Sequence, residues 1–251
     1  MQSIKTIYKI GPGPSSSHTF GPMMASKYIN EQYPEATNFK ITLFGSLALT
    51  GKGHLTDKII LKTLGTSKCE IIFDMKTPVE HPNTMIIEVF DKDTKIAKHT
   101  FVSIGGGKIE IDGKKGNVDP EIYPHTKMDD IQVYCNERHL RLDQYIDEVE
   151  DSDFDSYMNQ IFKQMLKTVN TGLKKTGVLP GSLKIDRVAH ALHQSAQSCS
   201  DIQDKNSLLL SSYAYAANEQ NASGGIVVTA PTMGSCGVLP SLVYHFYHDQ
   251  K

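Results

Sequence analysis

The distribution of apolar and polar positions marks the first half of the chain as strand-rich. Four short runs, at residues 39–44, 69–73, 85–90 and 96–102, are rich in Ile, Val, Phe and Thr and have the length of ordinary strands. The polar tetrapeptide at 91–94 separates the last two runs and predicts a hairpin. Apolar residues at helical spacing predict helices over 21–33, with Thr19 as a possible N-cap, and over 55–64.

The second half is predicted to be mainly helical. Apolar residues recur at helical spacing between 144 and 175, with acidic residues early and lysines late. The GVLPG segment at 177–181 breaks the pattern, which resumes over 185–198 and 207–218. We therefore expect an α+β fold with two domains. Residues 1–125 would hold a mixed sheet with helices, residues 126–251 would be mainly helical, and the linker would lie within 113–124.

Composition and charge exclude several classes of protein. The 251 residues carry 26 basic and 28 acidic side chains and are 39% hydrophobic, which argues against a disordered tail or a nucleic-acid-coating surface. No apolar stretch approaches the roughly 18 residues of a membrane span, and the N-terminus lacks the apolar core of a secretory signal. We expect a cytoplasmic protein that binds neither nucleic acid nor membrane. The four cysteines form no C-x-x-C pair, which argues against a disulfide scaffold or a self-contained zinc site.

The first segment with candidate chemistry is residues 11–19, GPGPSSSHT. Ser15, Ser16, Ser17 and Thr19 surround His18 just before the first predicted helix. Hydroxyls and backbone N–H groups at a helix start suit a small anion such as a carboxylate or phosphate. An N-cap with a flexible lead-in explains the same residues. Spacing alone leaves both interpretations open.

A second candidate, residues 45–57, lies between a predicted strand and a predicted helix. It differs from a phosphate-binding loop, because five residues separate Gly45 from Gly51 and Gly53 stands where Ser or Thr would bind magnesium. What remains is a tight loop that presents Lys52 and His54 at the sheet edge, or a purely structural turn.

The third candidate is residues 221–240, NASGGIVVTAPTMGSCGVLP. Its glycines allow the backbone to approach a ligand closely, and Cys236 lies between Ser235 and Gly237, where little bulk would hide its sulfur. We therefore expect an accessible thiol. A lone cysteine is more often buried filler, and general arguments do not decide between the two.

Together these segments resemble the iron-sulfur-dependent bacterial L-serine dehydratases, also called L-serine ammonia-lyases. The resemblance covers most of the chain and rests on five ordered motifs. These are residues 10–23 (IGPGPSSSHTFGPM), 51–57 (GKGHLTD), 103–107 (SIGGG), 177–184 (GVLPGSLK) and 221–240. Several ordered motifs are far more specific than any one of them.

The resemblance implies that an N-terminal α+β domain carries the SSSHT loop and that a helical catalytic domain holds a [4Fe-4S] cluster. It implies a lyase that converts L-serine to pyruvate and ammonia, and we expect a homo-oligomer. His18 resembles the base that removes the α-proton, with His54 as a second base, and Cys236 resembles a cluster ligand. Residues implied to bind substrate are Ser15, Ser16, Ser17, Thr19, Asn221, Ser223 and Gly224.

The resemblance also predicts an incomplete catalytic domain. In the family this domain continues beyond the P-T-x-G-x-C-G motif and carries further cluster cysteines, whereas this sequence ends 15 residues after Cys236. Cys69, Cys135 and Cys199 lie outside the family's cluster motifs and are interpreted as structural. We expect this chain alone to be inactive and to hold no stable cluster. The alternative is an amino-acid-binding regulatory module or an inactive fragment of the enzyme.

Overall fold

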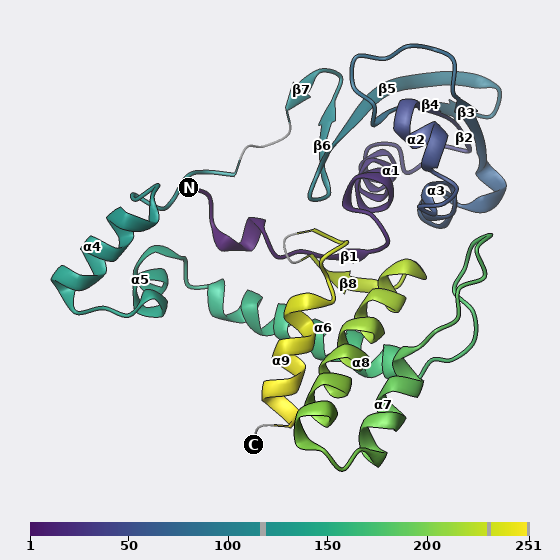
Figure 1. The fold of residues 1–251 in the computed structure, drawn as a ribbon. Coiled ribbons are helices and arrows are strands. Elements are labelled where there is room, and N and C mark those ends of the chain that lie inside the picture. The colour runs from purple at the N-terminus through teal and green to yellow at the C-terminus, as the bar shows by residue number, and fades with distance from the viewer. Residues whose placement is uncertain (116–118, 230–231, 250–251) are drawn as a thin grey trace.

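The computed structural model describes residues 1–115, 119–229 and 232–249. A mixed sheet with three helices forms the upper part of the molecule in Figure 1, and a group of helices forms the lower part. A short two-stranded ribbon lies between them. The α+β fold expected from the sequence is confirmed. Within the described residues, no helix combines the length and apolar character needed to cross a bilayer.

The main sheet has six strands in the order β3-β2-β4-β5-β6-β7. The strands are β2 (Asn38–Phe44), β3 (Cys69–Asp74), β4 (Thr84–Asp91), β5 (Thr94–Gly105), β6 (Lys108–Ile111) and β7 (Lys114–Lys115). β2 and β3 run parallel, and the other neighbours are antiparallel. All four predicted strands are confirmed, as is the hairpin, in which Asp91 pairs with Thr94 and Lys92 has a φ of 53°.

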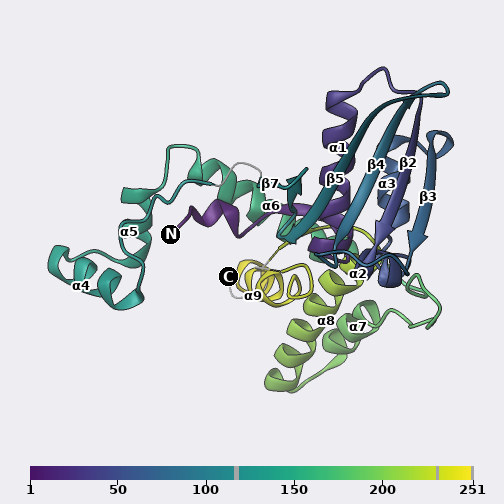
Figure 2. The same ribbon diagram turned by 90° about the horizontal axis from the view of Figure 1, so that it is seen from above.

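One face of this sheet is covered by α1 (Gly21–Gln32), α2 (Gly45–Thr50) and α3 (Thr56–Leu64), and Figure 2 shows α1 and α3 running along the strands. Ile29, Ile41, Ile60 and Ile87 have no exposed surface in this core. Burying each such side chain stabilises the fold by about 1.5–3 kcal/mol before losses of conformational entropy. The alternating burial along β2 and β4 is the strand period that the sequence shows.

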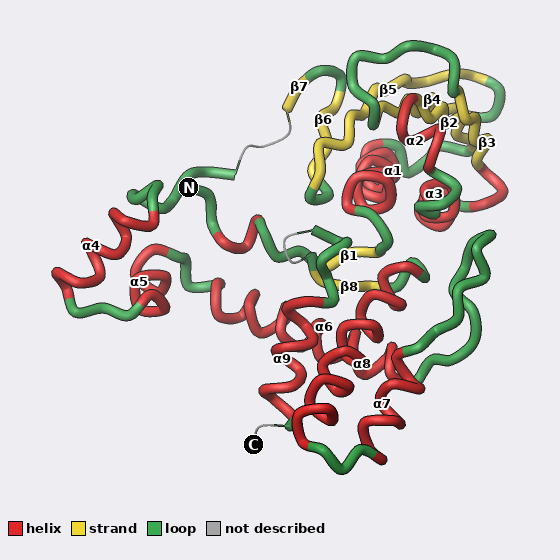
Figure 3. The backbone as a smooth tube through the Cα atoms, viewed as in Figure 1, coloured by secondary structure: helices red, strands yellow, loops and turns green. Residues whose placement is uncertain are grey.

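The lower helical body comprises α6 (Phe154–Leu173), α7 (Ala189–Ser198), α8 (Ile202–Ala222) and α9 (Val238–His248). Their apolar faces meet around Val169, Tyr213, Ala216 and Tyr244. The helix predicted over 144–175 is in fact two helices, because α5 (Leu142–Val149) ends at Val149 and α6 begins at Phe154. Residues 185–188 were also expected to be helical, but they belong to a long loop before α7, which Figure 3 shows extending away from the helices.

A small lobe made of α4 (Met128–Arg138) and α5 projects from the side of the molecule (Figures 1 and 2). It has its own core, in which Tyr123, Ile131, Cys135 and Tyr145 are buried. Part of the predicted linker, residues 116–118, lies outside the described residues.

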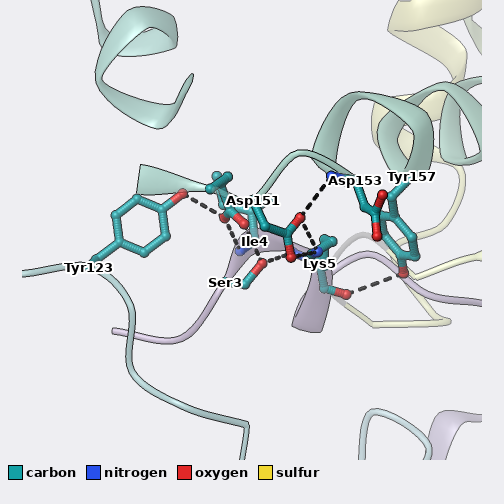
Figure 4. Close-up of polar contacts among 8 residues, drawn as sticks. Ser3, Ile4, Lys5, Tyr123, Asp151, Asp153 and Tyr157 are labelled. Carbon is teal, nitrogen blue, oxygen red and sulfur yellow. Dashed lines mark hydrogen bonds and ion pairs between the residues drawn. The ribbon is translucent and has the colours of Figure 1, made fainter. Parts of the chain in front are cut away.

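The N-terminal segment is tied to the start of α6 by polar contacts (Figure 4). The Glu150 carboxylate accepts hydrogen bonds from the Ser3 hydroxyl (2.6 Å), the Ile4 backbone N–H (2.8 Å) and the Tyr123 hydroxyl (2.7 Å). Further along, the Tyr157 hydroxyl donates to the Lys5 carbonyl. These contacts fix the direction in which the chain enters β1.

The ribbon pairs β1 (Ile10–Pro12) with β8 (Ile226–Val228), antiparallel, with Gly11 opposite Val227. Val227 and Val228 are fully buried or nearly so. Segments more than 200 positions apart in sequence are therefore held side by side. Neither strand is predicted by the sequence pattern.

A close helix crossing gives the first testable prediction. A Cβ added to Gly172 in α6 would lie 2.2 Å from the Ala216 carbonyl oxygen in α8. Gly172→Ala should lower the free energy of unfolding by about 1–3 kcal/mol, because overpacking outweighs the roughly 1 kcal/mol that Ala gains in helix propensity. Gly53→Ala is the control, since its new Cβ would meet nothing closer than 3.4 Å. A urea midpoint for Gly172→Ala at or above that of the wild type would contradict this packing.

Candidate functional site

The SSSHT loop is a defined turn that opens α1. The Ser15 hydroxyl accepts a hydrogen bond from the His18 backbone N–H (3.1 Å), and residues Ser16–Phe20 form one π-helical turn that continues into α1. Ser15 is thus the cap of this turn. The prediction of Thr19 as N-cap is wrong, because its hydroxyl instead donates to the His54 carbonyl oxygen (2.7 Å). The capping interpretation therefore holds for Ser15. Ser16 and Ser17 are half-buried and are not the cap of this turn.

Two reciprocal hydrogen bonds join this loop to the segment before α3. Thr19 donates to the carbonyl of His54, and the Thr56 hydroxyl donates to the carbonyl of His18. Both threonines are buried. The two imidazoles are consequently held together, with ring centroids 4.6 Å apart. The predicted presentation of His54 at this end of the sheet is therefore observed, although residues 45–50 form the short helix α2 rather than a loop.

The hydrogen-bond partners of His18 define its orientation. Its Nε2 lies 2.8 Å from the Ser46 hydroxyl, and its Nδ1 lies 3.4 Å from the Ser15 hydroxyl. Ser46 is held in the first turn of α2, where its N–H donates to the Pro82 carbonyl (2.7 Å). Burial, followed by the charge of His54, lowers the pKa of His18. At neutral pH His18 is therefore an uncharged imidazole with a lone pair available to accept a proton.

The orientation of His54 follows from a backbone contact. Its Nδ1 lies 3.0 Å from the Thr50 carbonyl oxygen, which can only accept a hydrogen bond. We therefore assign the proton of the neutral ring to Nδ1, which leaves the lone pair on Nε2. Both histidines can serve as bases in this arrangement.

The glycine-rich turn of residues 103–107 packs against the same loop. A Cβ on Gly107 would lie 2.6 Å from the Phe20 ring, and one on Gly21 would lie 2.1 Å from the Ser103 hydroxyl. The motif at 177–184 is not part of this assembly, since it lies on the long exposed loop, where Leu183 is 81% exposed.

The segment after α8 supports the loop from the other side. The Asn221 amide donates to the Pro14 carbonyl (3.3 Å), and the Gly13 N–H donates to the Gly225 carbonyl (2.9 Å). Gly13 has no room for a side chain, because a Cβ there would lie 2.1 Å from Asn221 Oδ1. The side chain of Asn221 is therefore buried against the loop backbone.

Three of the predicted substrate residues line a cavity of about 610 Å³. These are Thr19, Ser223 and Gly224. The hydroxyl of Ser223 donates to the Glu219 carbonyl (2.6 Å) and accepts from Arg187, so it is already engaged. The side chains of His18 and His54 are not part of the cavity wall. The predicted residues thus divide between the histidine pair and this cavity.

Cys236 has no exposed surface, contrary to the expectation of an accessible sulfur. It shares an apolar cluster with Phe20, Val227 and Met233. Its Sγ lies 3.6 Å from Asn218 Oδ1, and burial raises its pKa to about 12. Close packing by the ribbon and by Phe20 covers the thiol that the flanking glycine was expected to expose. Residues 221–240 nevertheless contact the end of the SSSHT loop, because this cluster contains Phe20, which follows His18 by two residues. Ala230 and Pro231 of this string lie outside the described residues.

The donor set does not complete an iron-sulfur cluster. A [4Fe-4S] cluster is held by four cysteine thiolates in its usual form. Among the residues that the structure describes, no three His, Cys, Asp or Glu side chains are grouped to hold a metal ion. Cys69 lies in β3, Cys135 in α4 and Cys199 after α7. The described chain offers one thiol, Cys236, beside the loop.

The amino-acid sequence matches the models of two known protein families. Residues 46–251 match the family model "Serine dehydratase alpha chain", and residues 3–72 match "Serine dehydratase beta chain". The chain belongs to the serine dehydratase family.

Curated relatives of this serine dehydratase chain are similar over almost its whole length. "L-serine dehydratase 2" of Escherichia coli K12 is 32% identical over 98% of the chain, "L-serine dehydratase" of Haemophilus influenzae is 29% identical over 98%, and "L-serine dehydratase" of Helicobacter pylori 26695 is 32% identical over 97%. The chain spans 66%, 66% and 65% of the lengths of these relatives.

The sequence did not predict two residues that hydrogen-bond to His18. Ser46 and Thr56 both lie in the candidate segment 45–57, yet neither was predicted to contact His18. Their types were a weak signal, since each is a hydroxyl at the start of a helix. Only the packing of α2 and α3 against the loop brings them to His18.

The histidine pair leads to a pH prediction. In NMR titration, His18 should protonate with a midpoint below its ordinary pKa of 6.5. The unfolded chain then binds this proton more readily than the folded one, so the free energy of unfolding should fall as the pH drops below about 6.5. His54→Gln should raise the midpoint of His18 while leaving it below 6.5, because burial is the larger cause. A wild-type midpoint at or above 6.5 would refute this description.

The burial of Cys236 leads to a labelling prediction. A thiol with a pKa of about 12 is roughly one part in 10⁴ thiolate at pH 8, and only the thiolate reacts with iodoacetamide. Peptide mapping should therefore show the half-buried Cys199 labelled at least about 100-fold faster than Cys236 in the folded chain. In guanidinium chloride the two rates should converge, and equal rates in the folded chain would contradict the burial.

Proposed function

We propose that this chain carries the substrate loop and the base of an L-serine ammonia-lyase that forms pyruvate and ammonia. The observation that carries the proposal is the uncharged His18 imidazole, held between Ser46 and Ser15 beside His54. The names of the relatives supply the substrate, L-serine. The cytoplasmic location and homo-oligomeric state expected from the sequence stay predictions.

His18 is the proposed general base. The Cα–H bond of serine breaks, its proton moves to the His18 ring, and its electron pair forms the Cα=Cβ double bond. The Cβ–O bond breaks at the same time and the hydroxyl leaves as hydroxide. The proton held on His18 then neutralises this hydroxide, so that one water is released and the neutral imidazole is restored. The resulting aminoacrylate tautomerises and is hydrolysed to pyruvate and ammonia. A positioned imidazole contributes roughly 10² to 10⁴-fold to such a proton transfer.

The neighbours of His18 have separate proposed duties. Ser46 holds the His18 ring at Nε2. In the proposed tautomer Nε2–H donates to the Ser46 hydroxyl, and the lone pair that takes the substrate proton is on Nδ1. Ser15, Ser16 and Ser17 receive the serine carboxylate or amine, and His54 is the second base. Thr19 and Asn221 act by holding the loop, through the His54 and Pro14 carbonyls.

Cys236 is proposed as one thiolate ligand of a [4Fe-4S] cluster. Its support is the shared apolar cluster with Phe20, which places the sulfur beside the substrate loop. The described residues provide no further ligand, so no step of the reaction is assigned to the cluster. The contribution of this chain is the proton transfer and the placement of serine.

The test is substitution of the base in an iron-loaded, full-length version of the enzyme, one that carries this chain together with the further cluster cysteines that the resemblance predicts. His18→Asn should lower kcat for pyruvate release from L-serine by about 10²–10⁴-fold while iron and sulfide contents stay unchanged. His139→Asn is the matched control, because His139 is exposed and has a φ of 56°, a conformation that asparagine tolerates. If His18→Asn retains kcat within tenfold of the control, His18 is not the base.

A further inference from the structure

Thr19, whose hydroxyl holds the His54 carbonyl, also lines the cavity described above. The cavity of about 610 Å³ is bounded by α1, α3 and the segment 223–226. Its walls are joined firmly, because the Asn30 amide in α1 donates to the Thr63 carbonyl in α3 (2.7 Å) and β1 is paired with β8. The cavity is therefore bounded by backbone elements that are bonded to one another.

Three lysines surround this cavity. Lys27 comes from α1, and Lys58 and Lys62 come from successive turns of α3. Among the described residues, no carboxylate oxygen lies within 4.0 Å of any of their ammonium groups. Like charges at positions i and i+4 of a helix destabilise it slightly. An anion in the cavity would remove that repulsion.

The remaining lining determines what kind of anion fits. Met23, Leu55, Ile59 and Ile226 supply an apolar surface next to the three ammonium groups. A volume of about 610 Å³ lies in the range of small-molecule and cofactor sites. L-serine is small and has almost no apolar surface, so it would leave most of the cavity unfilled. The lining suits a larger organic anion with two or more negative charges and an apolar body.

We propose that this cavity is a binding site for such an organic anion, separate from the serine site at His18. Thr19 lies between the two, because it lines the cavity and its hydroxyl holds the His54 carbonyl. A ligand seated against Thr19 therefore contacts the residue that keeps the histidine rings together. The inference does not depend on the assignment of serine as substrate.

The test is an NMR titration of the isotope-labelled chain with three probes. Adenosine 5′-monophosphate carries both the apolar body and the double charge, adenosine carries only the body, and inorganic phosphate carries only the charge. We expect the monophosphate to shift the resonances of Gly224, Gly225 and Lys62 with a Kd of about 1 mM or lower, at least tenfold tighter than either other probe.

Substitutions assign that binding to the lysines. The triple variant Lys27→Gln, Lys58→Gln, Lys62→Gln should bind the monophosphate at least tenfold more weakly. The control variant Lys76→Gln, Lys98→Gln, Lys163→Gln makes the same change in net charge at exposed positions outside the cavity and should bind as the wild type does. An unchanged His18 titration in the first variant shows that it is folded and that the histidine pair is intact.

Three outcomes would overturn the inference. One is the absence of shifts at the cavity with the monophosphate, and another is equal weakening in both triple variants, which would show a general effect of net charge. The third is that L-serine itself shifts the cavity resonances in a lysine-dependent way, which would make the cavity the substrate site. Loss of the His18 base role would leave the proposed anion site untouched.

Discussion

The candidate site depends on the pairing of β1 with β8. A two-stranded ribbon of three residues per strand is not stable alone in water. Here it is stabilised by burial of Val227 and Val228 and by the contact of Gly13 with Asn221, which leaves no space for a Cβ. Closing a loop of more than 200 residues costs conformational entropy, and the apolar cluster around Phe20 and Cys236 offsets it. Without this pairing the SSSHT loop would lose one of its connections to the helical body, the other being the contact of Asn221 with Pro14.

The histidine pair shows how burial and proximity act in the same direction. Burial disfavours the imidazolium form of His18, and a second imidazole at 4.6 Å adds repulsion whenever both are charged. The result is an imidazole that is uncharged at neutral pH and holds an added proton less tightly than a free histidine does. The backbone carbonyls held by Thr19 and Thr56 keep the rings at this separation, so these two threonines contribute to the lowered pKa of His18, of which burial is the larger cause.

The central strands and helices could be predicted because each is long enough for its residue pattern to be recognised in the sequence. β2, β4 and β5 contain runs of six or more residues rich in Ile, Val, Phe and Thr, and α1 and α3 repeat over at least two turns. β1 and β8 could not be predicted, since three residues contain no period and their partner is distant. The motifs indicated His18, His54 and the serines. They gave no sign that Ser46 would bond to His18 or that Cys236 would be buried, because both facts arise from packing between separate elements.

The burial of Cys236 sets the cost of any ligand role for its thiol. With a pKa of about 12, removing the thiol proton at pH 7 costs roughly 7 kcal/mol, since each pH unit corresponds to about 1.4 kcal/mol. A thiol that coordinates a metal does so as the thiolate, so metal binding at this sulfur would have to displace that proton. The same burial keeps the metal-free thiol protonated and slow to oxidise. Because Cys236 shares its apolar cluster with Phe20, which follows His18 by two residues, a metal bound to this sulfur would lie close to the turn that carries His18.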